Sequence, residues 1–411
     1  MKSITKILFV ADVALKSPSS GSEQVLCNQA LGLARTGMNV FAITRQNGSV
    51  PTVHRNLDQN VKEACYSASP DNVFKFFGSL FKETSRLFKS FAQDELFDAA
   101  VCHHPFAYFS LLISGKLKNM PVIHVFHSPT HQEYLLLNEQ KCRLRNAIPA
   151  KARWFIERYC LKRSNKIVVL SHYMKNLIVD TYDISADSIV VNPGGVDLER
   201  FAPVPDRSRL KEELGFPREH IHLLTVRNLE SRMGLDNLIK AIDIIKKNSL
   251  KIYLTIIGEG PERRKLERLI QEYRLTADIK LMGFVSSESL PLYYCAADFF
   301  ILPTRKLEGF GLVTPESLAC GTPVLGTPVG ATEEILANFN RNFLFKNATP
   351  HAMARGIQSA VKRYFKNETK YNELRCSCRD FAQKNYAWQR HIRQFKSIIL
   401  DVIAGRDARL N

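Results

Sequence analysis

The most constraining feature of this 411-residue sequence is an alternation of short apolar runs with helical patterns, which occurs twice along the chain. The first series has strand-like runs at 7–11, 40–44, 99–101, 122–126 and 166–170, and a helical pattern at 23–35. The second series has runs at 222–226, 252–257, 279–282, 299–302 and 323–325. Strands that alternate with helices form parallel sheets with helices on both faces. We therefore expect an α/β protein with two doubly wound, Rossmann-like domains.

The chain length and a Pro- and Gly-rich segment suggest where these domains lie. A chain of 411 residues is long for one hydrophobic core and suits two domains of about 200 residues each. The segment 193–206 lacks a helical period and contains several Pro and Gly residues, as linkers do. We therefore predict domains at 1–192 and 207–386, a linker at 193–206 and a separate C-terminal helical segment at 387–411.

Charge and cysteine content restrict the setting in which the chain works. The formal net charge is +17, which favours anionic partners such as nucleic acid or anionic lipid. No nucleic-acid-binding motif is present, so we expect no nucleic-acid partner. The nine cysteines show no C-x-x-C spacing, which favours a reducing, cytoplasmic compartment. Asp12 interrupts the apolar N-terminal stretch, so we interpret this stretch as a first buried strand and not as a secretory signal.

The segment from Leu302 to Leu336 indicates a chemistry. It holds two glutamates eight positions apart, Glu308 and Glu316, with a Gly-rich turn between them. Thr314 before Pro315 predicts a helix N-cap followed by Pro at the first helical position. The unpaired backbone N–H groups of such a helix end attract phosphate. An ionised carboxylate in the first helical turn would accept both hydrogen bonds of a ribose diol, and Glu308 would be free to face a sugar.

The motifs EGFG, PES, ACGTPV and GATEEI of this segment resemble the E-x7-E signature of retaining glycosyltransferases of family 4. The resemblance implies the GT-B fold, in which two Rossmann-like domains face a central cleft and a C-terminal helix crosses back to the first domain near a Trp, here Trp388. It also implies that Glu308 orients the donor sugar and that Glu316 anchors the ribose. Backbone groups of the loop and helix start would line the nucleotide, at Phe310, Gly311, Leu312 and Val313.

Two residues of the first half are further candidates. Gly21, in the turn 18–23 after the first strand, would let backbone N–H groups approach an anion because it lacks a Cβ, although a simple turn glycine is the alternative. His127 follows a strand, at the edge where wound folds bind ligands. The resemblance places a His here against the donor sugar. His103 and His104 also end a strand, but no carboxylate or Cys stands at metal-ligand spacing, so we expect no metal.

The stretch 226–234 departs from the family pattern. The family usually has an Arg and a Lys that neutralise the diphosphate, and the aligned positions here are Asn228 and Met233. Arg227 and Arg232 each stand one position earlier. The leaving diphosphate gains negative charge in the transition state, so at least one preorganised cation is required. We expect Arg232 to fill this role, with Arg227 as the second candidate.

Two other segments carry weaker signals. Gly258 and Gly260 resemble the family's G-x-G-P turn that lines the nucleotide, and an ordinary strand-to-helix loop is the alternative. The stretch 73–91 alternates Phe with Lys and Arg as a basic amphipathic helix does, which fits either a membrane surface or a core helix. The basic segment 141–166 adds to the positive charge near an anionic membrane.

The resemblance implies transfer of a hexose from a nucleoside diphosphate sugar to an acceptor hydroxyl, with retention of configuration and without a metal or other cofactor. The acceptor would be a glycan, a lipid-linked sugar or a small molecule in cell-envelope polysaccharide or glycolipid synthesis. An epimerase of the same fold and a noncatalytic membrane- or partner-binding relative are the alternatives. The anionic inner face of a membrane is a further candidate partner.

Overall fold

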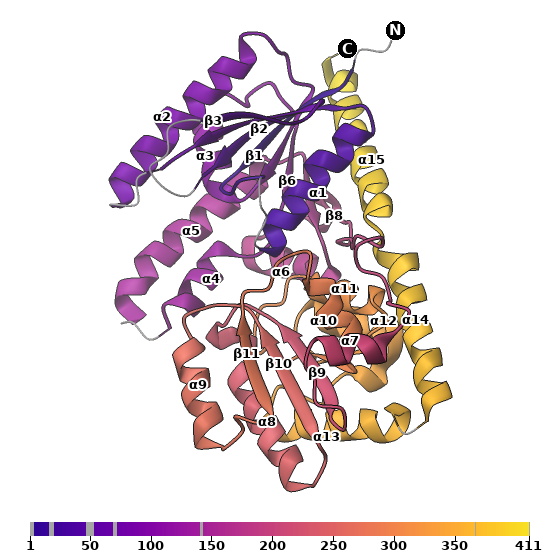
Figure 1. Cartoon of the computed structure of the whole chain (residues 1–411). Helices are drawn as coiled ribbons and strands as arrows, with labels where there is room; N and C mark the ends of the chain where they lie inside the picture. The colour runs from indigo at the N-terminus through magenta and orange to yellow at the C-terminus, as the bar shows by residue number, and fades with distance from the viewer. Residues whose placement is uncertain are drawn as a thin grey trace. The chain divides into compact units, whose positions relative to one another are not determined.

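The computed structural model describes residues 4–15, 20–46, 53–68, 72–139, 143–365 and 367–410. The chain divides into two compact units, of which the first comprises Met1–Gly194 with Trp388–Asn411 and the second comprises Gly195–Ala387. Each unit is a wound α/β structure with its own sheet (Figure 1).

The first unit is built on an eight-stranded sheet with the strand order β3-β4-β2-β1-β5-β6-β7-β8. All neighbouring strands are parallel except the antiparallel pair β3 and β4. The strand bounds are β1 Lys6–Ala11, β2 Asn39–Arg45, β3 Val53–Asp58, β4 Val61–Tyr66, β5 Ala99–His103, β6 Val122–Val125, β7 Lys166–Val169 and β8 Ile189–Val191. Residues 7–11 of β1 and 99–103 of β5 are fully buried because helices cover both faces of a parallel sheet.

The helices of the first unit include one from the far end of the chain. Their bounds are α1 Gly21–Arg35, α2 Val73–Ala92, α3 Pro105–Ile113, α4 Thr130–Leu137, α5 Arg143–Arg163, α6 His172–Tyr182 and α15 Trp388–Leu410. Helix α15 packs against α1, and the two run side by side in Figure 1. The approach is close at Gly32, where an added Cβ would lie 2.6 Å from the side chain of Ile392. The expected C-terminal helix therefore joins the first unit.

Helix α2 uses its aromatic side chains in the core. Leu80 and Leu87 are fully buried, and four partly buried aromatic residues pack against the same core, namely Phe76, Phe77, Phe88 and Phe91. Lys75, Lys82 and Lys89 are exposed on the other side of the helix. The core-helix interpretation of 73–91 therefore accounts for its apolar face.

The second unit is built on a five-stranded parallel sheet with the order β11-β10-β9-β12-β13. The strand bounds are β9 Ile221–Val226, β10 Ile252–Ile257, β11 Ile279–Gly283, β12 Phe299–Leu302 and β13 Val324–Gly326. The helix bounds are α7 Arg207–Glu213, α8 Leu235–Lys247, α9 Arg263–Glu272, α10 Leu290–Ala296, α11 Val313–Ala319, α12 Ala331–Asn340, α13 Pro350–Ala360 and α14 Glu368–Tyr386.

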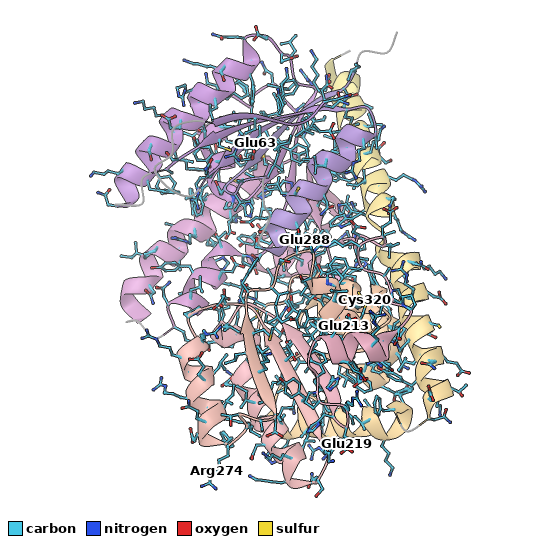
Figure 2. All side chains as sticks on the ribbon, in the orientation of Figure 1. Glu63, Glu213, Glu219, Arg274, Glu288 and Cys320 are labelled. Atoms are coloured by element: carbon cyan, nitrogen blue, oxygen red, sulfur yellow. The ribbon has the colours of Figure 1, made fainter. Side chains whose placement is uncertain are left out.

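The sequence did not predict every element. Strands β3 and β4 were missed because their polar residues hide the strand pattern, and one of these, Glu63, is buried (Figure 2). Its carboxylate accepts hydrogen bonds from the Thr44 hydroxyl at 2.7 Å and the Leu15 backbone N–H at 2.8 Å. Between α13 and α14 the chain forms a π-helical turn at Val361–Phe365.

Candidate functional site

The second unit has one place where the strand order reverses. From β9 the chain winds outward through β10 to β11, and then crosses to β12 on the other side of β9. Open α/β sheets bind ligands outside the carboxyl ends of the strands at such a switch point. Arg227 directly follows β9, and the loop 303–311 directly follows β12. The sheet order therefore brings together residues that lie about 80 positions apart in the sequence, as the pair Arg227 and Glu308 does.

At this switch point Arg227 and Glu308 form a buried ion pair. The guanidinium of Arg227 donates to the Glu308 carboxylate and, at 2.5 Å, to the hydroxyl of Thr304. The Thr304 hydroxyl in turn donates to the Glu308 carboxylate at 3.0 Å. Arg227 is 8% exposed and Glu308 is 7% exposed, and the Nε of Arg227 has no partner in the described part of the chain. The pair fixes the position of the Glu308 carboxylate.

Several glycines allow the loops at this edge to pack backbone against backbone. Gly258 has φ 132°, and a Cβ there would lie 1.9 Å from the carbonyl oxygen of Arg227. At Gly260 a Cβ would lie 2.6 Å from the carbonyl oxygen of Leu229. Both positions therefore require glycine for a steric reason, and the 257–260 turn packs directly on the 227–229 loop.

Two more glycines lie against Glu308 itself. Gly330 has φ 61°, and a Cβ there would lie 2.2 Å from the carbonyl oxygen of Glu308. Gly311 has φ 73°, and a Cβ there would lie 3.1 Å from Oε1 of Glu308. Leu307, directly before the glutamate, adopts φ 58°, which is uncommon for a residue other than glycine. Backbone strain of this kind gathers at functional sites and is maintained by the surrounding structure.

Arg232 also contacts the loop 303–311 that carries Glu308. It lies in the 3-10 turn Ser231–Met233, and one guanidinium nitrogen donates to the carbonyl oxygen of Leu307 at 2.9 Å. Its Nε donates to the carboxylate of Glu230 at 3.0 Å. The Arg232 side chain is 18% exposed, compared with 6% for that of Arg227. Arg232 is thus the more accessible of the two cations at this edge.

Glu316 lies in α11, which starts earlier than the sequence predicted. The helix begins at Val313, with Leu312 already in a helical conformation, so the prediction of Thr314 as N-cap and Pro315 as first helical residue was wrong. The positive φ of Gly311 turns the chain before Leu312, which explains the earlier start. The helix has seven residues.

The Glu316 side chain is buried beside Tyr294, whose hydroxyl donates to its carboxylate at 2.9 Å. Burial raises the pKa of Glu316 from 4.5 to about 7, and the Tyr294 hydrogen bond offsets this effect only in part. The carboxyl is therefore not a fully ionised acceptor near neutral pH, contrary to our expectation. The neighbouring predicted residues differ in exposure: Phe310 and Leu312 are buried, and Val313 is half-buried.

The first unit also reverses its strand order once. From β1 the chain winds through β2 and the β3–β4 pair, and then crosses to β5 on the other side of β1. Gly21 is the first residue of α1, behind the N-cap Ser20, which forms a reciprocal capping box with Glu23. Pro18 and Ser19 of the predicted anion turn lie outside the described residues.

Histidines gather at this second switch point. The Nδ1 of His103, the last residue of β5, lies 2.9 Å from Nε2 of His127, which follows β6. The rings of His104 and His127 stack with centroids 5.1 Å apart. Burial lowers the pKa of His103 and His127 well below 6.5, and neighbouring histidines lower both further. Burial also lowers the pKa of His104. All three rings are therefore neutral at pH 7. From the sequence we placed His103 and His104 at a strand end, but of this unit's histidines we named only His127 as a candidate site residue.

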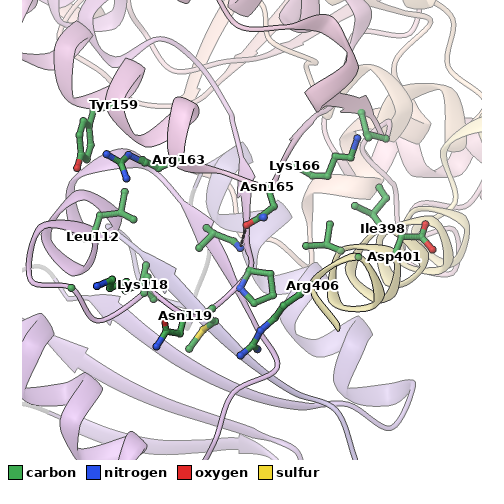
Figure 3. A pocket seen from close by; sticks show the side chains of 18 residues that line it. Leu112, Lys118, Asn119, Tyr159, Arg163, Asn165, Lys166, Ile398, Asp401 and Arg406 are labelled. Atoms are coloured by element: carbon green, nitrogen blue, oxygen red, sulfur yellow. Dashed lines mark hydrogen bonds between the residues drawn. The ribbon is translucent and has the colours of Figure 1, made fainter. Parts of the chain in front are cut away.

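Two further observations concern what this unit could hold. In the described ranges, no three His, Cys, Asp or Glu side chains form a group able to hold a metal ion. A hollow of about 1090 Å³ opens at the amino ends of β6 and β7, lined among others by Lys118, Arg163, Asn165, Ile398 and Arg406 (Figure 3). Ligands of wound folds bind at the opposite, carboxyl edge, and this hollow contains none of the predicted site residues.

Comparison with known families agrees with the two-part architecture. Residues 19–200 match the model of the family described as Glycosyltransferase Family 4. Residues 206–382 match the model described as Glycosyl transferases group 1. Together the two models cover most of the chain in the expected order. The chain belongs to glycosyltransferase family 4.

Curated relatives of this family 4 glycosyltransferase match parts of it. An uncharacterized glycosyltransferase of Methanocaldococcus jannaschii is 24% identical over 59% of this chain and 60% of its own length. A GDP-mannose-dependent alpha-(1-6)-phosphatidylinositol monomannoside mannosyltransferase of Mycolicibacterium smegmatis is 31% identical over 41% of this chain and 46% of its own length. The matches thus span about half of these relatives.

Solved structures match over nearly the whole chain. Sucrose-phosphate synthase from Thermosynechococcus elongatus superimposes with a TM-score of 0.84 and 22% identity, covering 98% of this chain and 100% of that one. Anabaena HepE in complex with UDP-glucose gives a TM-score of 0.73 and 17% identity, covering 96% and 99%. The family 4 glycosyltransferase therefore has the GT-B fold. None of its described helices is both long and apolar enough to cross a membrane.

Proposed function

We propose that this chain transfers a hexose from a nucleoside diphosphate sugar to an acceptor hydroxyl with retention of configuration, in glycan or glycolipid synthesis. The observation that carries the proposal is the buried Arg227–Glu308 pair at the switch point between β9 and β12. Family membership supplies the reaction class, and this pair supplies a charged, preorganised group where a wound fold binds its ligand. No metal is required, because the candidate charges for the leaving diphosphate are guanidinium groups.

In this proposal Arg227 and Arg232 have different roles. Arg227 is nearly enclosed and already paired with Glu308, so it positions that carboxylate for the sugar. Arg232 is the more exposed cation, and its hydrogen bond to the Leu307 carbonyl holds it beside the Glu308 loop. We assign to Arg232 the neutralisation of the diphosphate, whose charge grows as the bond to the sugar breaks. The departing diphosphate then accepts the proton of the acceptor hydroxyl.

Binding and turnover of labelled UDP- and GDP-sugars test this assignment. Wild-type protein should hydrolyse one of these donors slowly or transfer its sugar, and Glu308→Gln should reduce that rate about 100-fold while the protein still binds the nucleotide. Arg232→Ala should weaken binding of the nucleoside diphosphate itself. Arg305→Ala is the matched control, because Arg305 lies in the loop 303–311 with Glu308 but its guanidinium pairs with Asp236 at 2.7 Å.

The outcomes separate the alternatives. A nucleotide sugar that is epimerised without an acceptor would assign the chain to the other reaction of this fold. Absence of binding to every nucleotide sugar would favour a noncatalytic relative. Equal losses in Arg232→Ala and Arg305→Ala would show that the loop 303–311 needs the contacts of both arginines for its fold and would refute the assignment of Arg232.

We also propose that the first unit binds an anionic membrane surface through α5 and not through α2. The aromatic face of α2 is used in the core, whereas α5 exposes Ile148 (79%) and Phe155 (60%) at a spacing of seven residues. Lys151 and Lys162, also exposed, lie at spacings that place them near the same face. Apolar side chains flanked by lysines suit an anionic interface.

Co-sedimentation with phosphatidylglycerol vesicles tests this surface. Binding should fall with added salt, and Phe155→Glu should reduce it because an apolar contact of α5 is lost. Lys82→Glu on α2 should reduce binding only through the loss of positive charge. Equal effects of the two substitutions, or no binding at low salt, would remove the proposal for α5.

A further inference from the structure

The switch point of the first unit carries two consecutive histidines, His103 and the strained His104, that the proposed chemistry does not use. His104 adopts φ 65° and ψ 154°, a conformation that non-glycine residues rarely adopt. The surrounding structure maintains it, because Asp12 accepts hydrogen bonds from the backbone N–H groups of Phe106 at 3.0 Å and Ala107 at 2.8 Å. The chain is thus pinned immediately after the strained residue.

This conformation lets two consecutive histidines contact the same third ring. His103 reaches His127 through the 2.9 Å Nδ1 to Nε2 contact, and His104 stacks on the same ring at 5.1 Å. In a regular strand, successive side chains point to opposite faces, so both rings could not meet His127. The strained turn therefore holds His127 from two directions.

The contact between His103 and His127 contains a single proton. Both rings are neutral, so one nitrogen of this pair donates and the other accepts. The other nitrogen of His103, Nε2, is buried and has no partner in the described part of the chain. If His127 donated, this buried Nε2 would carry an unpaired N–H group, and buried unpaired N–H groups are rarer than unpaired acceptor sites.

The arrangement that avoids this unpaired N–H has His103 donating from Nδ1 to Nε2 of His127. His127 then carries its own proton on Nδ1, because the bond at one ring nitrogen fixes the state of the other. Among the described residues, Nδ1 of His127 has no protein partner, and the side chain is half-buried at the carboxyl edge of the sheet. It is free to bind an incoming group.

We propose that His103 is a positioning residue that locks His127 in the Nδ1–H tautomer, so that His127 offers the substrate a hydrogen-bond donor and not an acceptor. The complementary group on the ligand is an oxygen with a free lone pair. In the proposed glycosyl transfer this is a sugar hydroxyl oxygen, and only this identity rests on the proposed function. The tautomer itself follows from the contacts of the first unit.

Nitrogen-15 spectroscopy of the full-length protein with labelled histidine tests the tautomer directly. The His127 signals are identified by their loss in His127→Gln, and their two-bond couplings show which ring nitrogen carries the proton. We expect the Nδ1–H form at pH 7 in the wild-type protein. An Nε2–H form, or a protonated ring, would overturn the proposal whatever the protein catalyses.

Variants of His103 test its role. His103→Phe removes the donor and keeps a ring beside Phe9, with which His103 now stacks at 5.8 Å, so His127 should shift to a mixture of tautomers. His103→Asn places an amide N–H where Nδ1 was and should restore the Nδ1–H form. An unchanged His127 spectrum in His103→Phe would refute the positioning role.

Turnover of the donor sugar adds a second readout. His103→Phe should lower kcat at least about 10-fold, and His103→Asn should recover most of the loss. His124→Phe is the control, since His124 is also a buried histidine of this sheet but its ring packs against Tyr108 and Phe126. If no donor is turned over, the proposed function fails, while the spectra still decide the tautomer.

Discussion

Replacing Glu316 by Gln is expected to change how the stability of the second unit depends on pH. Glu316 is 5% exposed, and burial raises its pKa from 4.5 to about 7. A difference of about 2.5 in pKa corresponds to about 3 kcal/mol of free energy between the protonated and ionised forms. Gln has nearly the same shape and can still accept the hydrogen bond from Tyr294, so the substitution chiefly removes the ionisation.

The sign follows from where each state releases its proton. Below pH 4.5 the carboxyl is protonated in the folded and the unfolded chain, and ionisation contributes nothing. Between pH 4.5 and 7 the unfolded chain has lost the proton and the folded chain retains it, so stability falls as pH rises. Above pH 7 the loss levels off at about 3 kcal/mol. The wild-type protein should therefore lose stability relative to Glu316→Gln between about pH 4.5 and pH 7.

Urea unfolding at a series of pH values measures this difference. Both tryptophans, Trp154 and Trp388, belong to the first unit, so their fluorescence follows that unit alone. Circular dichroism records both units, and the transition seen only by this method reports the second one. Glu213→Gln, on the surface of α7 (Figure 2), is the matched control and should leave the pH dependence unchanged. Parallel curves for wild type and Glu316→Gln would refute the burial argument.

Three further substitutions have expected outcomes in the same unfolding assay. Gly258→Ala should destabilise the second unit by several kcal/mol, because its Cβ would lie 1.9 Å from the carbonyl oxygen of Arg227, whereas Gly78→Ala, with open space around it in α2, should be neutral or slightly stabilising. Asp298→Ala should lower the free energy of unfolding by about 3–5 kcal/mol, because it leaves the partly buried cations Arg207 and Lys211 without their buried carboxylate. An effect below about 1 kcal/mol would show that water replaces the carboxylate.

The strands that could be predicted are those whose sequence shows their burial. The bounds predicted for β10 and β12 agree with the structure, because β12 is continuously apolar and β10 is interrupted only by Thr255, as expected for strands covered on both faces. Strand β8 has only three residues and β4 contains a buried glutamate, so neither gives a clear apolar run. The start of α11 was missed because Gly311 sets the turn through its positive φ, which no helix-capping pattern reveals.

The contacts within the candidate site depend on information that a single sequence does not contain. Nothing near Arg227 in the sequence indicates that it pairs with Glu308, since the two meet only because β9 and β12 are neighbours in the sheet. His103 and His127 likewise meet because β5 and β6 are neighbours. A motif can name the residues of one strand end, but the sheet order decides which strand ends face each other.

The dependence of the site on strand order also predicts which substitutions should have little effect on donor binding. In each sheet a buried charged or strained residue directly follows a strand beside the reversal, as Arg227 does after β9 and His104 does after β5. The strand β11 lies at the outer edge of its sheet, separated from β12 by β10 and β9, and Phe284 after it is 77% exposed. If ligand binding follows the reversal of strand order, Phe284→Ser should leave donor binding unchanged while Thr304→Val, which removes a hydroxyl from the Glu308 carboxylate, weakens it. A binding loss at Phe284 equal to that at Thr304 would mean that the outer edge of the sheet contributes to the site.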